Sequence, residues 1–419
     1  MIPADTMILP KSFDAEDFLQ NYWQKKPLLI RGNGKAFVDP ISPEELAGLA
    51  CEDFIESRLI NYYPEDSNWK LRNGPFKEKD FLKLPDKNYT VLVQAVDQWH
   101  EDVRAMLKDF SFIPSWRIDD IMISYSTDGG NVGPHFDYYD VFLIQGLGQK
   151  KWQLGGHADS SSKLLGNKGL RLLAEFNTKQ EYLLAPGDIL YLPPNLAHWG
   201  IAIGNSMTYS VGFRTPSYAE IISELSDDII EQLGEDQRYK DNSPRIPQRP
   251  GEIPVDAIRQ VQDLLLEQLK RPDVIAHWFG SSMTSPKYPD ISVIVDKKLD
   301  AAALEEELKA GAQLYKNPAA RFAFIQTPER LQLFADGVEF SCELLLLPLI
   351  NNLCALADLP ENLLDTVLQE TGIEQATAVL AILAKLHNQG TLLLEYPSKN
   401  QPSKNQTSIG SQTPKGSQT

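Results

Sequence analysis

Apolar residues follow two different periods along this chain. Residues 14–50 predict a helix at AEDFLQNYW, a strand at PLLIRG and a second helix at SPEELAGLA, for which Ser42 and Glu45 form a capping box. From about Tyr89 the pattern changes to short apolar and β-branched runs: TVLVQAV, RIDDIMISYS, DVFLIQGLG, KKWQLG, EYLLAPGDILYLP, IAIG and SMTYSVGFR. Glycine, proline and asparagine separate these runs, and one helix, WHEDVRAMLKDF, interrupts them. The pattern predicts an antiparallel β-sandwich or barrel.

Beyond Pro216 the apolar positions recur at helical spacing. They predict one helix between Ile221 and Leu233 and another between Ile258 and Leu269, joined by the proline-rich loop NSPRIPQRPGEIP. Two amphipathic helices beside a β domain either cover that domain or pair with a second copy of the chain. We expect the second arrangement, a homodimer.

The residues from 290 to 395 form a third unit. Short strands (QLYKN, RFAFIQ, LQLFADGVEFS) precede three helices and a closing strand, TLLLE, an order that resembles a winged helix. A DNA-reading winged helix carries a basic recognition helix, whereas this region is acidic, so we interpret it as a structural or protein-contact module. The expected segments are an N-terminal α/β segment (1–88), a β-rich catalytic domain (89–216), a helical dimerisation region (217–285), a winged-helix-like domain (286–396) and a disordered tail (397–419).

Composition narrows the class of partner. The net charge of −17 argues against nucleic acid as a direct partner and suits a basic protein. The three cysteines lack CxxC spacing, which fits the reducing cytosol, and the N-terminus has no apolar signal core. The longest apolar run, LLLLPLINNLCALA, is too short to span a bilayer. We therefore expect a cytoplasmic protein without membrane association.

The stretch GPHFDYYD contains His135 and Asp137, one residue apart. In an extended strand these two side chains share a face, which is good geometry for a metal site. Alone the pair is a weak signal, because a surface histidine in a hairpin gives the same pattern. A third candidate, His198, follows the turn-rich stretch PGDILYLPPNLAHWG, and a barrel brings it near the pair. Two histidines and one carboxylate form the facial triad of iron(II) oxygenases.

A cation at a suitable offset extends this hypothesis. Lys150 begins the strand KKWQLG, fifteen residues after His135, and its ammonium is a candidate to hold the distal carboxylate of 2-oxoglutarate. A surface lysine in a hairpin is the alternative. Lys151 is the neighbouring candidate, and strand alternation places only one of the two inside.

The strand DDIMISYS offers further candidates for the lining of the site. If Ser124 faces the cavity, Met122 and Asp120 face it too, and Asp119 points the other way in a structural role. The Ser124 hydroxyl is a candidate donor to the co-substrate carboxylate, and Asp120 is a candidate acceptor for a cationic side chain. Plain core packing is the alternative for Met122.

These residues together resemble the JmjC-type 2-oxoglutarate oxygenases of the cupin superfamily. The stretches WRIDDIMISYS, GPHFDYYDVFLIQGLGQKKWQLG, PGDILYLPPNLAHWGIA and MTYSVGFRTP resemble the bacterial ribosomal oxygenases in particular, and the likeness extends over roughly residues 13–395. It implies an α+β chain: a double-stranded β-helix (jelly-roll or cupin) catalytic domain, a helical dimerisation region and a winged-helix-like C-terminal domain. It also implies hydroxylation of an arginine in the sixteenth protein of the large ribosomal subunit.

The resemblance assigns roles to the candidates. Iron(II) would bind His135, Asp137 and His198, and 2-oxoglutarate would bind Ser124 and Lys150, with dioxygen as the oxidant. The substrate arginine would meet four further residues: Asp120, Met122, Tyr139 and Ser210. In such a site Asp120 would hold the guanidinium and aim the β-carbon of the arginine at the iron.

Two alternatives remain open from the sequence. A JmjC histidyl hydroxylase or lysine demethylase would use the same iron centre, and Tyr138 with Tyr139 keeps an aromatic cage for methyl-lysine in play. A non-catalytic cupin that binds a partner through its acidic C-terminal module belongs to a different class, because a fold does not fix a function.

Overall fold

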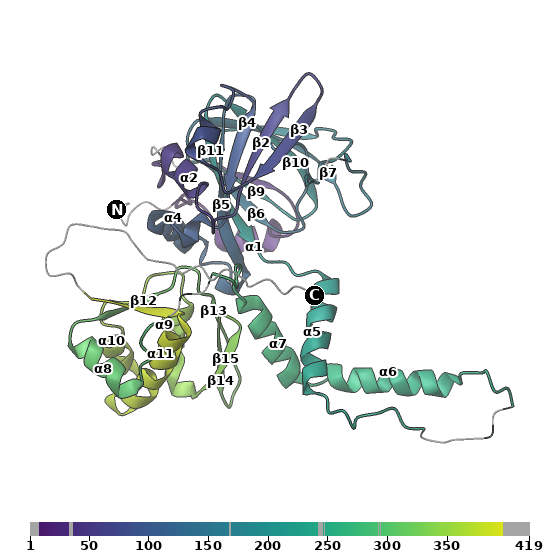
Figure 1. Ribbon diagram of the computed structural model, residues 1–419, viewed down its shortest axis with the longest axis vertical. Helices are drawn as coiled ribbons and strands as arrows, with labels where there is room; N and C mark the ends of the chain where they lie inside the picture. The colour runs from purple at the N-terminus through teal and green to yellow at the C-terminus, as the bar shows by residue number, and fades with distance from the viewer. Residues whose placement is uncertain are drawn as a thin grey trace, which may run out of the picture.

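Two facing antiparallel β-sheets form the upper body of the molecule (Figure 1). This computed structural model describes residues 8–32, 37–166, 169–241, 246, 248–291, 293 and 295–396. The tail that we expected to be disordered, 397–419, lies outside the described residues.

The larger sheet has eight strands, and all its pairs are antiparallel. In spatial order they are β1 (Leu28–Ile30), β9 (Ile189–Leu192), β6 (Val141–Gln145), β11 (Ser206–Phe213), β5 (Ile118–Ser126), β4 (Tyr89–Val93), β2 (Ser57–Tyr63) and β3 (Asn68–Asn73). Three of these strands precede residue 89. The boundary that we expected at residue 89, between the N-terminal segment and the catalytic domain, therefore divides residues that share one sheet.

The smaller sheet consists of β10 (Leu196–Ile203), β7 (Gln149–His157) and β8 (Gln180–Leu184) in that order. Apolar side chains from both sheets meet between them, as Trp152 and Leu154 do against Val141, Leu143 and Leu190. The arrangement confirms the expected jelly-roll. Along each strand, successive side chains point alternately to the space between the sheets and to the outer face.

Short helices cover the outer face of the larger sheet. They are α1 (Ala15–Asn21), α2 (Pro43–Leu49), α3 (Glu78–Phe81), α4 (Glu101–Ala105), η1 (Val96–Gln98), η2 (Met106–Phe110) and η3 (Ser115–Arg117). Phe18 of α1 is fully buried and lies edge-on to Tyr191, with ring centroids 4.8 Å apart. The predicted capping box of α2 is present, with Ser42 accepting from the Glu45 amide.

Three longer helices follow the β domain: α5 (Tyr218–Gln232), α6 (Val255–Leu269) and α7 (Pro272–Thr284). The helix α7 packs against α5 through a buried cluster of Leu225, Val274 and Trp278. In contrast α6 projects away from the body (Figure 1), and none of its residues, all of which the structure describes, is buried.

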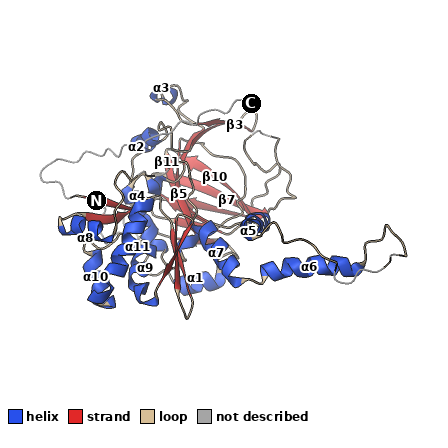
Figure 2. Cartoon of the chain, turned by 60° about the horizontal axis from the view of Figure 1, so that its bottom comes forward, coloured by secondary structure: helices blue, strands red, loops and turns tan. Residues whose placement is uncertain are grey.

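The C-terminal unit has a core of its own, centred on β14 and α11. Its elements are α8 (Ala301–Lys309), β12 (Gln313–Lys316), β13 (Phe322–Gln326), β14 (Leu331–Ala335), β15 (Val338–Cys342), η4 (Leu344–Leu346), α9 (Leu347–Cys354), α10 (Leu363–Thr371), η5 (Ile373–Gln375), α11 (Ala376–Gln389) and β16 (Leu392–Glu395). They lie below the β domain on the side of α4 (Figures 1 and 2). Within the described part of the chain, no helix is both long and apolar enough to cross a membrane.

Candidate active site

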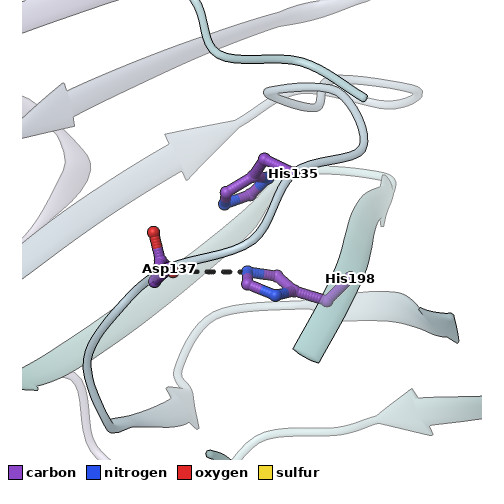
Figure 3. Close-up of side chains that lie close together, drawn as sticks. All are labelled: His135, Asp137 and His198. Atoms are coloured by element: carbon purple, nitrogen blue, oxygen red, sulfur yellow. Dashed lines mark ion pairs between the residues drawn. The ribbon is translucent and has the colours of Figure 1, made fainter. Parts of the chain in front are cut away.

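Two histidines and an aspartate meet between the sheets. His198 lies on β10, whereas His135 and Asp137 lie in the loop before β6 (Figure 3). The loop pairs with β10 through reciprocal hydrogen bonds between the backbones of His135 and His198, and the Asn195 amide donates to the Asp137 carbonyl. These contacts hold one potential ligand atom from each of the three side chains within 4.8 Å of one another. Asp137 Oδ2 is 3.6 Å from His198 Nε2.

Hydrogen bonds orient both imidazole rings. Nδ1 of His135 lies 2.9 Å from the Gly133 carbonyl, and Nδ1 of His198 lies 2.9 Å from the Leu196 carbonyl. A carbonyl only accepts, so each Nδ1 carries the proton and each Nε2 keeps its lone pair for a metal. Burial lowers the pKa of His198 to about 4, so this ring is neutral at physiological pH, as a metal ligand must be. The donor set therefore fits iron(II).

One buried asparagine anchors the loop that carries His135. The side-chain oxygen of Asn131 accepts from Trp69 Nε1 (2.7 Å), Trp199 Nε1 (3.0 Å) and the Gly133 amide (3.0 Å). The two tryptophans come from β3 and β10, so Asn131 ties the loop to both sheets. The sequence analysis missed this residue, although its position between two glycines in GGNVGPH indicated a constrained turn.

Lys150 points between the sheets, as expected. It is 5% exposed, whereas the adjacent Lys151 faces outward and pairs with Glu181. Lys150 Nζ lies 3.4 Å from Thr208 Oγ1 and 5.2 Å from the centre of the Trp152 ring. In the described chain it forms no ion pair with a carboxylate, and burial lowers its pKa to about 8. A buried cation without an anion indicates that the site accepts an anionic ligand.

Three cross-strand pairs line the facing wall. Ser124 on β5 lies opposite Thr208 on β11, Met122 lies opposite Ser210, and Asp120 lies opposite Gly212. Directly opposed residues of an antiparallel pair share a face, so this wall runs from the Lys150 end to the Asp120 end. The sequence analysis placed Asp120, Met122 and Ser124 on one face, which the structure confirms.

Met122 packs in an apolar cluster with Leu92, Leu172 and Trp199, so it has a packing role in the wall. Its sulfur also lies 4.0 Å from Arg58 Nη2.

Tyr139 is 42% exposed and stands at the solvent side of the wall. The negative charge of Asp137 raises the pKa of Tyr139, which keeps the phenol protonated.

Asp120 has an internal cationic partner that sequence reasoning missed. Lys287 Nζ lies 2.9 Å from Asp120 Oδ2 and 2.6 Å from Asp119 Oδ2. The same Asp120 oxygen accepts from Gln94 Nε2 (2.8 Å) and from the Ala95 amide (2.9 Å). Lys287 is 167 residues away in sequence, and no local pattern pointed to it.

Asp119 turns away from the wall and is structural, as expected. It pairs with Lys287, with Arg214 Nε at 3.3 Å and with Arg321 Nη2 at 3.0 Å. Burial tends to raise the pKa of Asp119, but the charges of Lys287 and Arg321 outweigh it and hold the pKa below its ordinary value.

Facing antiparallel sheets around a His–Asp–His cluster define a cupin of the JmjC class. The JmjC domain family matches residues 105–221, and the ROXA-like winged helix family matches residues 263–392. The second match confirms the winged-helix expectation, and it begins within α6, upstream of the boundary expected at residue 286.

Individual relatives cover most of the chain. The ribosomal protein uL16 3-hydroxylase of Escherichia coli is 39% identical over 274 residues, 65% of this chain and 72% of the relative. A probable ribosomal oxygenase of Haemophilus influenzae is 33% identical over 342 residues, 78% of this chain and 82% of the relative. This chain belongs to the family of JmjC-domain ribosomal oxygenases.

Solved structures agree with this assignment. The X-ray structure of E. coli YcfD matches with a TM-score of 0.80 at 32% identity and covers 92% of this chain and 99% of that one. The ribosomal oxygenase YcfD in complex with cobalt and 2-oxoglutarate matches with a TM-score of 0.78, also at 32% identity, over 92% of this chain and 99% of that one.

Proposed function

We propose that this protein is an iron(II)- and 2-oxoglutarate-dependent hydroxylase acting on the β-carbon of an arginine in a large-subunit ribosomal protein. The observation that carries the proposal is the cluster of His135, Asp137 and His198 in the same inner space as the buried Lys150, which has no carboxylate partner among the described residues. Membership of the ribosomal oxygenase family and the name of the uL16 3-hydroxylase relative support it.

His135, Asp137 and His198 would hold the iron through the two Nε2 atoms and one carboxylate oxygen. With 2-oxoglutarate and dioxygen, iron(II) supplies an oxidative decarboxylation coupled to insertion of one oxygen atom into a C–H bond. The residues of this chain contribute position. Because the backbone bonds between the loop and β10 fix all three ligands before any metal arrives, binding requires little rearrangement.

Lys150 would bind the distal carboxylate of 2-oxoglutarate, with Thr208 and Ser124 beside it. Lys150 lies opposite Ala202 on β10, four residues from His198, which is about 13 Å along a strand. The lysine side chain and a five-carbon dicarboxylate together fill that separation. Trp152 Nε1, which is buried without a protein acceptor in the described chain, is a further polar group on this side.

Asp120 would receive the guanidinium of the substrate, with Met122, Tyr139 and Ser210 along its path. The net charge of −17 attracts a basic ribosomal protein by long-range electrostatics. We place this activity in the cytoplasm, where the ribosomal substrate is made. An aromatic cage for methyl-lysine has less support, because Arg171 already covers the Tyr138 ring at 5.4 Å.

We further propose a homodimer through the helical region. The exposed apolar side chains of α6 include Ile258, Val261 and Leu265, and α5 adds Ile222 and Ile230. Ile258, Val261 and Leu265 share one face of α6. An exposed apolar face of this kind marks an interface, and a second copy of the same helices is its self-complementary partner.

A turnover assay tests the proposed function. The full chain is incubated with iron(II), 2-oxoglutarate and a uL16 peptide containing the candidate arginine, and the peptide is read by mass spectrometry. We expect one added oxygen on the arginine in the wild type and none in Asp137→Ala, which removes one of three ligands. Succinate without a modified peptide would point to a working iron centre with another substrate. If iron is bound but neither succinate nor hydroxylated peptide forms, the alternative of a non-catalytic cupin that binds a partner would be favoured.

A further inference from the structure

Among the described residues, only one oxygen of the Asp120 carboxylate has hydrogen-bond donors. Oδ2 carries three donors, from Gln94, Ala95 and Lys287. In the described part of the chain, no donor lies on Oδ1. An incoming N–H group therefore has one acceptor available on this residue, and its position is set by what surrounds Oδ1.

Gly212 lies directly beside that oxygen. It is opposite Asp120 in the β11–β5 pair, and a Cβ at this position would be 3.7 Å from Asp120 Oδ1 and 4.0 Å from Cε2 of Tyr139. Because Gly212 has no side chain, a space remains between Asp120 Oδ1 and the Tyr139 ring. Tyr139 is 42% exposed, so its ring borders both this space and the solvent.

Packing does not explain why a glycine stands here. At Gly200, in contrast, a Cβ would lie 2.7 Å from the Trp152 ring, so that position requires glycine. At Gly212 the nearest atoms would be at ordinary van der Waals distance, and the backbone is outside the left-handed region. Alanine fits at Gly212 without strain. The absent methyl group keeps space open, and an interior strand otherwise gains from a side chain.

We propose that Gly212 is a specificity-determining residue: it forms the floor of the subsite where a planar guanidinium donates to Asp120 Oδ1 beside the Tyr139 ring. This inference rests on the proposed function for the identity of the cation. Lys287 acts in the same subsite as a positioning residue, because it saturates Oδ2 and leaves Oδ1 as the acceptor. The Gly212→Ala methyl group occupies the volume that the guanidinium needs, whereas the metal ligands and Lys150 are untouched.

The test compares wild type, Gly212→Ala and the control Gly48→Ala. Gly48 lies on α2 with no atom within 4 Å of an added Cβ, so the control makes the same chemical change away from the site. The first measurement is binding of N-acetylarginine amide, followed by NMR, to protein loaded with metal and 2-oxoglutarate. The second is hydroxylation of the uL16 peptide, together with a peptide whose guanidinium side chain is one methylene shorter.

We expect Gly212→Ala to weaken binding of N-acetylarginine amide at least fivefold and to raise KM for the arginine peptide at least tenfold. The shorter side chain should lose less, and the melting temperature should stay at the wild-type value. Equal binding of the amide by wild type and Gly212→Ala overturns the inference, whatever the peptide does. Loss of amide binding in Gly212→Ala, with no peptide hydroxylation by the wild type, supports the subsite and refutes the proposed substrate.

Discussion

At the scale of single residues, burial changes the acid–base chemistry of Lys150. Its ammonium is buried without a carboxylate partner in the described chain, and burial lowers its pKa from 10.5 to about 8. A bound dicarboxylate would raise the pKa of Lys150 again, since an opposite charge favours the protonated form of the lysine.

The pH dependence of 2-oxoglutarate binding follows from that shift. Below about pH 8 Lys150 is charged and attracts the anion; above it the free enzyme carries a neutral amine and must take up a proton to bind. We expect Kd for 2-oxoglutarate to be flat below pH 7.5 and to rise above pH 8, approaching tenfold per pH unit. Quenching of tryptophan fluorescence under anaerobic conditions measures it.

Lys150→Arg is the matched variant for this measurement. A guanidinium stays charged at every pH in the range, so the rise above pH 8 should disappear even if the affinity is lower overall. A wild-type Kd that is constant to pH 9.5, or a rise that persists in Lys150→Arg, would assign the anion to another group.

The residues also show how far sequence reasoning extends. Strand alternation required that only one of Lys150 and Lys151 lie inside, and it grouped Asp120, Met122 and Ser124 on one face, because a period of two is a local property. The ion-pair partner of Asp120 could not be predicted from the sequence. Lys287 comes from a loop after α7, and only the packing of the C-terminal unit against β5 brings it to that carboxylate.

At the scale of elements, one carboxylate joins the catalytic sheet to the C-terminal unit. Asp119 on β5 pairs with Arg214, which follows β11, with Lys287, which follows α7, and with Arg321, which precedes β13. Arg214 also donates to the carbonyls of Ser282, Met283 and Ser285 at the end of α7.

Asp119→Ala removes the shared acceptor and leaves three partly buried cations without it. Breaking a buried ion pair from one side is destabilising by about 3 kcal/mol, and we expect a loss of that order in the free energy of unfolding. Denaturant titration followed by tryptophan fluorescence measures it. Glu306→Ala, which breaks an exposed pair with Lys309, is the control and should change little. An Asp119→Ala protein as stable as the control contradicts this role.

Element prediction failed where the pattern was weakest. The strands β2 and β3 were not predicted, and β3 is largely exposed, with the polar sequence NWKLRN. Its Trp69 is buried because it packs with Ile60, Leu92 and Leu172 and donates to Asn131, and all four residues lie outside β3 in sequence. The buried central strands β5, β6, β9 and β11 were all predicted, since their apolar runs are dictated by burial itself.

At the scale of the whole molecule, α6 is the element that the single chain does not explain. Of its apolar side chains, Ile258, Val261 and Leu265 are 59%, 46% and 62% exposed, and the helix lies apart from the body (Figure 2). A helix without a buried face in its own chain gains little stability from packing. The proposed homodimer supplies the missing contact.

Leu265→Glu tests this arrangement, because a charge in the centre of an apolar helix contact must be desolvated without a partner. We expect wild type to sediment as a dimer at micromolar concentration, and Leu265→Glu to raise the dimer Kd at least a hundredfold, so that the monomer dominates. Gln260→Glu places the same charge on the opposite, polar face of α6 and should remain dimeric. A monomeric wild type, or a Leu265→Glu protein with unchanged mass, would remove the second copy as the partner of α6. Since Asp137 and Lys150 lie within one β domain, the dissociated variant should still form succinate.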